Sequence, residues 1–537
     1  MSTYSRRRFL VGSSAAAAAL TVPLTNLWSK RARARTFGDL IEDPAGILDL
    51  PEGFTYTILE EWGQDMDDGY RVPGRPDGMA CFEGPDGTWI LMRNHEVSLF
   101  DVINGPYGFG QAPDEAYDAN AFGGVTRVVI DAETMTRISS NLVLTGTVRN
   151  CAGGPSPWGW LSCEENVDGD HGYVFVCPTD ATQVVPPQRV EGYGRFNHEA
   201  AAVDPETNIC YLTEDRGDSC FYRFVPDDPA IPFVGTLQAL RVVDQPVLDT
   251  SEGLSVGDTL TVQWVDLENP TPSGDTLRDE AQSLGAATFS RGEGLWFHDG
   301  QVYFTATNGG PAGYGQIFRL VDGPEEGELE LIAQSESEDE LDFPDNITVA
   351  PWGQLFIAED GDDEQYVRSI DESGAVRAFA RNALSESEFA GVCFSPDGRA
   401  MFVNIQGQGL TLMVTGPFPE LPDDPDEPAG SDDGGETDGD DAAETDGAEE
   451  SGESGNEDGP GQPETSGTST TGAPPPAEAS SGSESTGATP TNLSDDGAGC
   501  SCSSGESSPI GLAATVGALA LGLAARHEGT GTIRDDD

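Results

Sequence analysis

The feature that most constrains this chain is a recurring pair of short apolar runs joined by a tight turn. The pattern is seen in TRVVIDAETMTR (126–137), AAAVDPETNICYLTED (200–215), GLWFHDGQVYFTAT (294–307), ITVAPWGQLFIAED (347–360) and GVCFSPDGRAMFVNI (391–405). Such runs, bounded by Gly, Pro, Asn and Asp, are typical of paired β-strands. Residues 37 to about 418 show no long amphipathic helical pattern. The repetition predicts an all-β, six-bladed β-propeller-like domain, with a β-sandwich as the alternative.

The second run of several units ends in acidic residues at the same place, as in Glu214-Asp215 and Glu359-Asp360. In a propeller the inner strands line a central channel, so equivalent strand ends meet at one mouth. Carboxylates that converge without a cation repel one another and lose solvation, which costs several kcal/mol. The pattern therefore predicts sites for hard cations with oxygen ligands, such as Ca²⁺.

A second signal lies in NCAGGPSPWGWLSCEEN (150–166), where Cys163 stands directly before Glu164 and Glu165. Two adjacent carboxylates repel each other, a cation relieves that repulsion, and a thiolate is itself a metal ligand. This indicates a metal site. The structural alternative is an edge strand with a buried cysteine and solvated glutamates.

Composition limits the partners of the chain. It carries 94 acidic against 27 basic residues, a net charge of −67, so a polyanion would be repelled and we expect no nucleic-acid binding. Solvation in a salty environment and binding of multivalent cations both account for this acidity. Seven of the nine cysteines lie before residue 418, an odd number. An exported protein can pair some of them, for example Cys210 with Cys220, and we expect Cys163 to stay unpaired.

The two ends of the chain differ from the body. Residues 1–36 contain SRRRFL and an Ala-rich apolar run, which predicts a twin-arginine export signal and a periplasmic or cell-surface location; a single membrane anchor is the alternative. Residues 419–499 are rich in Asp, Glu, Gly, Ser, Thr and Pro, which predicts a disordered acidic spacer. Residues 500–537 join a cysteine motif to an apolar run and resemble sorting signals of the MYXO-CTERM type, so we expect a membrane tether there. A simple C-terminal anchor is the alternative.

Several motifs of the 37–418 body resemble the PhoX family of secreted alkaline phosphatases. They are the 150–166 stretch, RNHE (93–96), GRFNHEAA (194–201), TEDR (213–216), RGEG (291–294) and FPDNI (343–347). The resemblance implies a propeller-like fold whose site holds Fe³⁺ and Ca²⁺. It implies iron ligands at Cys163, Glu199 and Glu293, a phosphate clamp at Arg291, and Asn150 near the substrate oxygens. Its candidate calcium ligands are Glu164, Glu96, Asp215, Asp345, Asn346, Glu359 and Asp360.

Together these observations predict an exported, metal-dependent phosphatase that hydrolyses small phosphate monoesters for phosphate acquisition. A phosphate dianion needs positive charge around it, and in so acidic a chain metal ions must supply most of it, helped by Arg291. Two alternatives stay open: a calcium-dependent, lactonase-like propeller hydrolase, and a non-catalytic surface propeller stabilised by calcium. Only the phosphatase needs Cys163, Arg291 and Glu293 to act together.

Overall fold

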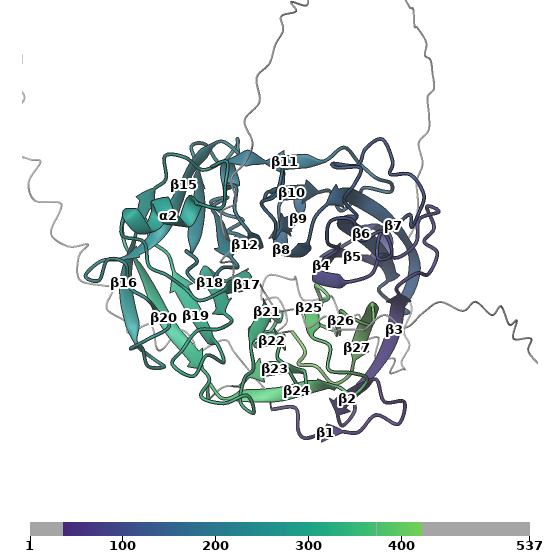
Figure 1. Cartoon of the computed structure of the whole chain (residues 1–537). Helices are drawn as coiled ribbons and strands as arrows, with labels where there is room; N and C mark the ends of the chain where they lie inside the picture. The colour runs from purple at the N-terminus through teal and green to yellow at the C-terminus, as the bar shows by residue number, and fades with distance from the viewer. Residues whose placement is uncertain (1–35, 372, 422–537) are drawn as a thin grey trace, which may run out of the picture. The chain divides into compact units, whose positions relative to one another are not determined.

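The computed structural model describes residues 36–371 and 373–421, which form β-sheets arranged around a common centre (Figure 1). In this part of the chain there are one short helix, α2 (Leu277–Ser283), and two 3-10 turns, η1 (Pro85–Gly87) and η2 (Glu191–Tyr193). The predicted all-β class is therefore confirmed almost completely. No helix in the described ranges has the length and apolar character needed to cross a membrane. The segments predicted at 1–36, 419–499 and 500–537 lie outside the described residues, apart from a few at their borders.

Three sheets are antiparallel meanders of four strands each. The first contains β4 (Pro76–Glu83), β5 (Thr88–His95), β6 (Gly123–Asp131) and β7 (Thr136–Thr147). The second contains β8 (Asn150–Ser156), β9 (Gly159–Glu164), β10 (Val174–Cys177) and β11 (Gln188–Val190). The third contains β25 (Phe389–Phe394), β26 (Ala400–Ile405), β27 (Leu410–Thr415) and β3 (Thr55–Glu61). Because β3 comes from the other end of the body, its pairing with β27 fastens the two ends of the fold together.

The other two sheets are longer. One runs in the order β1 (Leu40–Ile41), β2 (Leu48–Pro51), β24 (Val376–Asn382), β23 (Tyr366–Ile370), β22 (Leu355–Glu359) and β21 (Pro344–Val349). The other runs β12 (His198–Val203), β13 (Cys210–Glu214), β14 (Tyr222–Pro226), β15 (Gly235–Val242), β16 (Thr259–Asp266), β20 (Gly327–Gln334), β19 (Gln316–Val321), β18 (Gln301–Ala306) and β17 (Gly292–His298). The arrangement is propeller-like, but the described strands form five sheets rather than six separate blades. The reason is that β16 pairs with both β15 and β20 and so fuses two meanders.

The predicted strand pairs are all present. Four of them, β12–β13, β17–β18, β21–β22 and β25–β26, are the first two strands of a meander, whereas the pair at 126–137 is the outer pair β6–β7. Apolar side chains fill the space between neighbouring meanders, for example in the stack of Phe221, Phe304 and Phe318 between the two meanders of the nine-stranded sheet. This apolar filling is the main term that holds the sheets in place, because it removes large aromatic surfaces from water.

A β-bulge recurs near the start of the innermost strands. In β4, β8, β12, β17 and β21 the first residue pairs with the last residue of the next strand, and regular pairing resumes only at the fourth residue. In β4, for example, Pro76 pairs with His95 and the next pair is Met79 with Arg93. A bulge re-aims the side chains that it leaves unpaired. The side chain of the second residue in each of these strands therefore does not follow the regular alternation between the two faces of the sheet.

Candidate active site

The bulged strands and their partners bring two sets of polar side chains to the centre of the fold. The inner set is the second residue of each bulged strand: Asp77, Cys151, Glu199, Glu293 and Asp345. The strand-end set is the residue that directly follows β5, β9, β13 and β22: Glu96, Glu165, Asp215 and Asp360. Members of the two sets interact electrostatically with one another, so they share one region.

Three carboxylates of the inner set lie close enough to share a cation. Oxygens of Glu199, Glu293 and Asp345 all lie within 4.8 Å of one another. Burial, and after it the charge of Glu293, raises the pKa of Glu199 well above its usual range, and burial raises the pKa of Asp345 to about 8. Asp77 Oδ1 is buried and has no hydrogen-bond partner among the described residues. Carboxylate oxygens that lie this close together, with few hydrogen-bond donors from the protein, form a suitable site for a metal ion.

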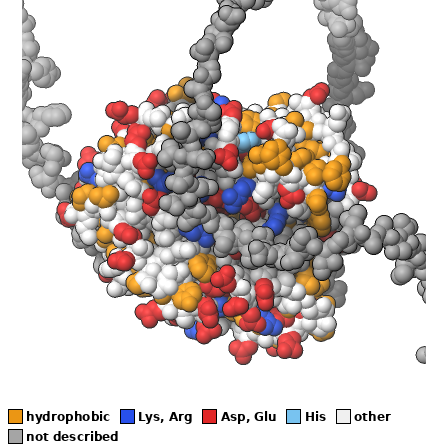
Figure 2. Space-filling view, in the orientation of Figure 1, with side chains coloured by type: hydrophobic (Ala, Val, Ile, Leu, Met, Phe, Trp, Pro, Cys, Tyr) orange, Lys and Arg blue, Asp and Glu red, His pale blue; other side chains and the backbone are white. Residues whose placement is uncertain are grey.

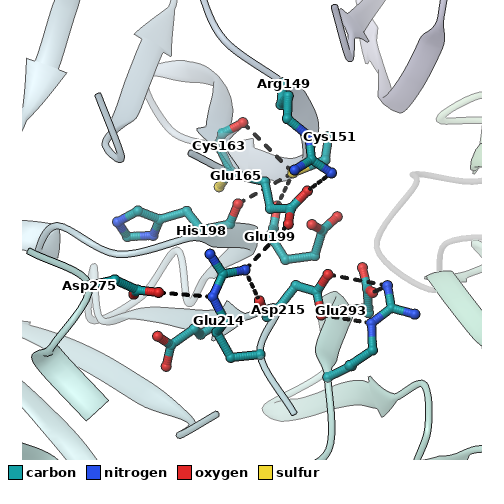
Figure 3. Close-up of polar contacts among 12 residues, drawn as sticks. Arg149, Cys151, Cys163, Glu165, His198, Glu199, Glu214, Asp215, Asp275 and Glu293 are labelled. Carbon is teal, nitrogen blue, oxygen red and sulfur yellow. Dashed lines mark hydrogen bonds and ion pairs between the residues drawn. The ribbon is translucent and has the colours of Figure 1, made fainter. Parts of the chain in front are cut away.

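The structure separates the two cysteines of the 150–166 stretch. Cys151 belongs to the inner set: its Sγ lies 3.3 Å from the carbonyl oxygen of His198, and burial, followed by the charges of Glu199 and Glu165, raises the pKa of its thiol. Cys163, on β9, packs in an apolar cluster with residues such as Leu161. Figure 3 shows Cys151 beside Glu165 and Glu199. The predicted metal ligand Cys163 is therefore placed in the core, and Cys151 occupies the position among the carboxylates.

All seven cysteines of the body are free thiols. The expected disulfide between Cys210 and Cys220 is absent, and the expectation of an unpaired Cys163 is confirmed. Cys210 begins β13, whereas Cys220 lies in the loop before β14, and both are fully buried in the same apolar cluster. There they act as small apolar side chains.

Arginines neutralise part of the strand-end set. Arg149 lies between two of its members, with Nη2 2.6 Å from Glu165 Oε2 and Nε 3.1 Å from Glu96 Oε1. Burial nevertheless outweighs Arg149 and raises the pKa of Glu165 to about 8. Arg291 donates through Nε to Asp215 Oδ1 at 2.8 Å and also contacts Glu293. Arginine and carboxylate side chains therefore lie against one another in this region, where Figure 2 shows blue and red groups together.

Two carboxylates that directly precede members of the strand-end set, Glu164 and Glu359, point into the sheets instead. Glu164 is fully buried, accepts from the backbone N–H groups of Val148 and Gly172 at 3.0 Å, and lies 2.7 Å from His171 Nδ1. Glu359 is also fully buried, and its Oε1 accepts from Arg368 Nε at 2.7 Å. Both were predicted calcium ligands. The structure places them in hydrogen-bond networks within the sheets, although Glu359 Oε2 has no partner in the described chain.

The two predicted asparagines have different surroundings. Asn150 is fully buried, donates through Nδ2 to Ser162 Oγ at 2.8 Å, and accepts from the Thr147 hydroxyl, so both ends of its amide are engaged. Asn346 donates to Asp345 Oδ1 at 3.0 Å and accepts from the backbone N–H of Gly391. Asn346 therefore orients a member of the inner set, whereas Asn150 ties the start of β8 to its neighbours.

Of the predicted residues, the structure brings together Glu96, Glu199, Asp215, Arg291, Glu293, Asp345, Asn346 and Asp360. Sequence reasoning did not single out Asp77, Cys151, Arg149 or Glu388, and it named Glu165 and Arg216 only as parts of the 150–166 and TEDR motifs. Arg216 lies 2.9 Å from Asp275 and 3.7 Å from Glu165, and the carboxyl group of Glu388 interacts with Asp360. A usable signal was present in the chain, because Pro76-Asp77-Gly78, Asn150-Cys151-Ala152 and Gly292-Glu293-Gly294 are equivalent starts of inner strands.

The fold and the site together define a propeller-like protein with an acidic centre that can hold metal ions. The sequence profile of the PhoX alkaline phosphatase family matches residues 35–142 and 133–409. The chain therefore belongs to this family, whose members are phosphoester hydrolases.

Comparison with solved structures gives the same fold. The chain is similar to Pseudomonas fluorescens PhoX in complex with vanadate, a transition state analogue, with a TM-score of 0.56 and 19% identity over 72% of this chain and 97% of the other. A gluconolactonase from Xanthomonas campestris matches with a TM-score of 0.37 and 11% identity over 71% of this chain and 99% of that one. That second likeness is too weak to carry an argument. No curated protein matches the sequence significantly.

Proposed function

We propose that the protein is an exported metal-dependent phosphatase that hydrolyses small phosphate monoesters at an iron and calcium site and so supplies phosphate to the cell. The observation that carries this proposal is the cluster of Glu199, Glu293 and Asp345 beside the buried thiol of Cys151. Membership of the PhoX family supplies the reaction class. The twin-arginine motif in residues 1–36 supports export.

The donor chemistry fits the two kinds of metal ion. A thiolate beside carboxylates suits a transition metal, so Cys151, Glu199 and Glu293 are the proposed ligands of Fe³⁺. The remaining oxygen donors suit Ca²⁺. We assign this second role to Asp77, Glu96, Asp345, Asp360 and Glu388, with Glu165 and Asp215 at the border between the two groups. When bound, the metal ions would supply the positive charge that a phosphate dianion requires.

Arg291 is the proposed phosphate clamp. It holds Asp215 and Glu293 at once, which fixes its guanidinium group at the edge of the carboxylate cluster. A planar guanidinium group binds phosphate oxygens through parallel N–H donors, so this position orients the ester toward the inner set. Arg149 is held in the same way by Glu96 and Glu165, and there it can stabilise negative charge on the substrate.

Two structural expectations belong to the same proposal. Counting β12–β15 and β17–β20 as separate blades that share β16 gives six blades, one of which also carries β1 and β2, and this is the arrangement we propose for residues 37–418. Residues 419–499 would then serve as a spacer and 500–537 as a sorting or membrane-tethering segment. A lactonase would need neither Cys151 nor the paired arginines, so the observed site favours the phosphatase.

The test combines metal analysis with enzyme assay of the exported protein, purified without chelator. We expect iron and calcium together with hydrolysis of p-nitrophenyl phosphate at alkaline pH. Glu293→Gln should lower activity by about 10- to 100-fold, in line with the loss of groups at a metal site. Glu133→Gln, in the exposed turn between β6 and β7, is the matched control and should leave activity unchanged. Calcium without iron, and no hydrolysis, would refute the proposal.

A further inference from the structure

Three arginines occupy one structural position in different sheets. Arg75, Arg149 and Arg291 each directly precede an inner strand, two residues ahead of its inner-set side chain. All three have left-handed backbone angles, with φ of 50°, 50° and 54°. This conformation is uncommon for residues other than glycine, and its repetition shows that the same local turn places each guanidinium group. Arg75 is thus equivalent by position to the two arginines already assigned to the site.

Arg75 differs from the other two in its partners. Arg149 pairs with Glu96 and Glu165, and Arg291 pairs with Asp215 and Glu293. Arg75 donates through Nη1 to the neutral side-chain oxygen of Gln406 at 3.2 Å, and it forms no ion pair within residues 36–371 and 373–421. Its side chain is exposed. Because a guanidinium group carries five N–H donors, most of those on Arg75 remain available.

The surroundings of Arg75 place it beside the proposed metal ligands. Gln406 donates through Nε2 to Asp77 Oδ2 at 2.9 Å and to Glu96 Oε2 at 3.0 Å. The backbone carbonyl oxygen of Arg75 accepts from the N–H of Glu96 at 2.8 Å. Gln406 therefore links Arg75 to a member of the inner set and to a member of the strand-end set. The guanidinium group of Arg75 is thus connected through Gln406 to Asp77 and Glu96, whereas Arg291 is held by Asp215 and Glu293.

We infer that Arg75 is a substrate-binding residue that donates hydrogen bonds to an anionic oxygen of the ester, with Gln406 as its positioning residue. The oxygen belongs either to the phosphoryl group that is transferred or to an acidic group on the leaving part of the substrate. An unneutralised guanidinium group at the edge of so acidic a centre is a suitable first contact for an anion. This inference rests on the proposed phosphatase function.

The test compares Arg75→Gln, Arg75→Lys and the control Arg377→Gln in the metal-loaded protein. Glutamine keeps a β-carbon at the same left-handed position, so no new backbone strain is introduced. Arg377 lies on the outer part of its sheet, with 55% of its side chain exposed. The assays are hydrolysis of p-nitrophenyl phosphate, hydrolysis of an ester that also carries a carboxylate on its leaving part, and calorimetric binding of inorganic phosphate.

If Arg75 binds the transferred phosphoryl group, Arg75→Gln raises KM for both esters and Kd for phosphate about tenfold, with kcat nearly unchanged, and Arg75→Lys recovers part of the loss. If Arg75 binds the leaving part, Arg75→Gln raises KM only for the ester that carries a carboxylate on its leaving part. Both results support the inference. Unchanged constants in every assay, or equal changes in Arg377→Gln, would overturn it.

Failure of the proposed function gives a different result. In that case the wild-type protein hydrolyses neither ester. Phosphate binding that is weakened by Arg75→Gln would still establish Arg75 as an anion-binding residue. No phosphate binding by the wild-type protein would overturn the inference together with the proposed function.

Discussion

The adjacent carboxylates at the strand ends differ sharply in their surroundings. Glu164 points into its sheet and is satisfied by backbone N–H groups and His171, whereas Glu165 points to the centre, where burial raises its pKa to about 8. Glu214 and Asp215 repeat the pattern, because Glu214 is fully buried and pairs with Arg278 of α2, whereas Asp215 contacts Arg291. The pleat of the strand sends neighbouring side chains to opposite sides. One carboxylate of each pair thus supports the fold, and the other is available for chemistry.

The largest expected effect separates the two members of one pair. Glu165→Gln should lower metal content and reduce phosphatase activity about 10- to 100-fold, because it removes a charged group at the metal site. Glu164→Gln should instead lower the free energy of unfolding by about 3 to 5 kcal/mol, because it leaves buried donors and His171 without their charged partner. Activity assays and denaturant unfolding of both variants measure this contrast. Equal effects of the two changes on activity would contradict the assignment of Glu164 to the fold and of Glu165 to the metal site.

A second prediction concerns the bulge that aims the inner set. A β-carbon added at Gly294 would lie 2.3 Å from the carbonyl oxygen of Asp345 and 2.6 Å from the backbone nitrogen of Ile347. Gly294→Ala should therefore push β21 away from Glu293 and cost about 1 to 3 kcal/mol of stability together with much of the metal affinity. Gly300→Ala is a suitable control, because its β-carbon meets nothing within 4 Å, although its φ of 76° adds some backbone strain. Similar metal affinity in both variants would contradict the proposed role of the bulge.

The last prediction concerns the pH dependence of the metal-free protein. The pKa values of Glu165 and Asp345 are raised to about 8 in the folded state, mainly by burial, against about 4 in an unfolded chain. The folded state therefore binds protons more tightly, and its free energy of unfolding should be highest below about pH 4 with respect to these groups and fall as pH rises toward 8. Thermal unfolding of chelated protein between pH 5 and pH 9 measures this slope. Added calcium should reduce it, and a midpoint that rises with pH would contradict the account.

Much of the fold could be predicted from the sequence. The strand pairs, the tight turns and the acidic strand ends are local patterns, and the structure contains each of them. The pairing of β16 with two neighbours could not be predicted, because it depends on contacts between residues far apart in the chain, such as Val262 with Gly327. For the same reason, the expected six separate blades are found as five sheets.

The two cysteines of the 150–166 stretch could not be told apart as metal ligands from the sequence. Adjacency to Glu164 and Glu165 favoured Cys163, but alternation along β9 directs Cys163 into the apolar core. Cys151 reaches the centre because the bulge in β8 re-aims its side chain. A bulge shifts which residues face the channel, and it is visible only when inner-strand starts such as Pro76-Asp77-Gly78 and Asn150-Cys151-Ala152 are aligned with one another.

The most direct test of the account is the metal content of Cys151→Ser and Cys163→Ser, purified side by side with the wild-type protein and without chelator. The account predicts that Cys151→Ser loses iron and phosphatase activity. It predicts that Cys163→Ser keeps both in its folded fraction and loses only stability, because a polar hydroxyl replaces a buried thiol. Iron lost from Cys163→Ser and retained in Cys151→Ser would contradict the assignment of the inner set as the metal site.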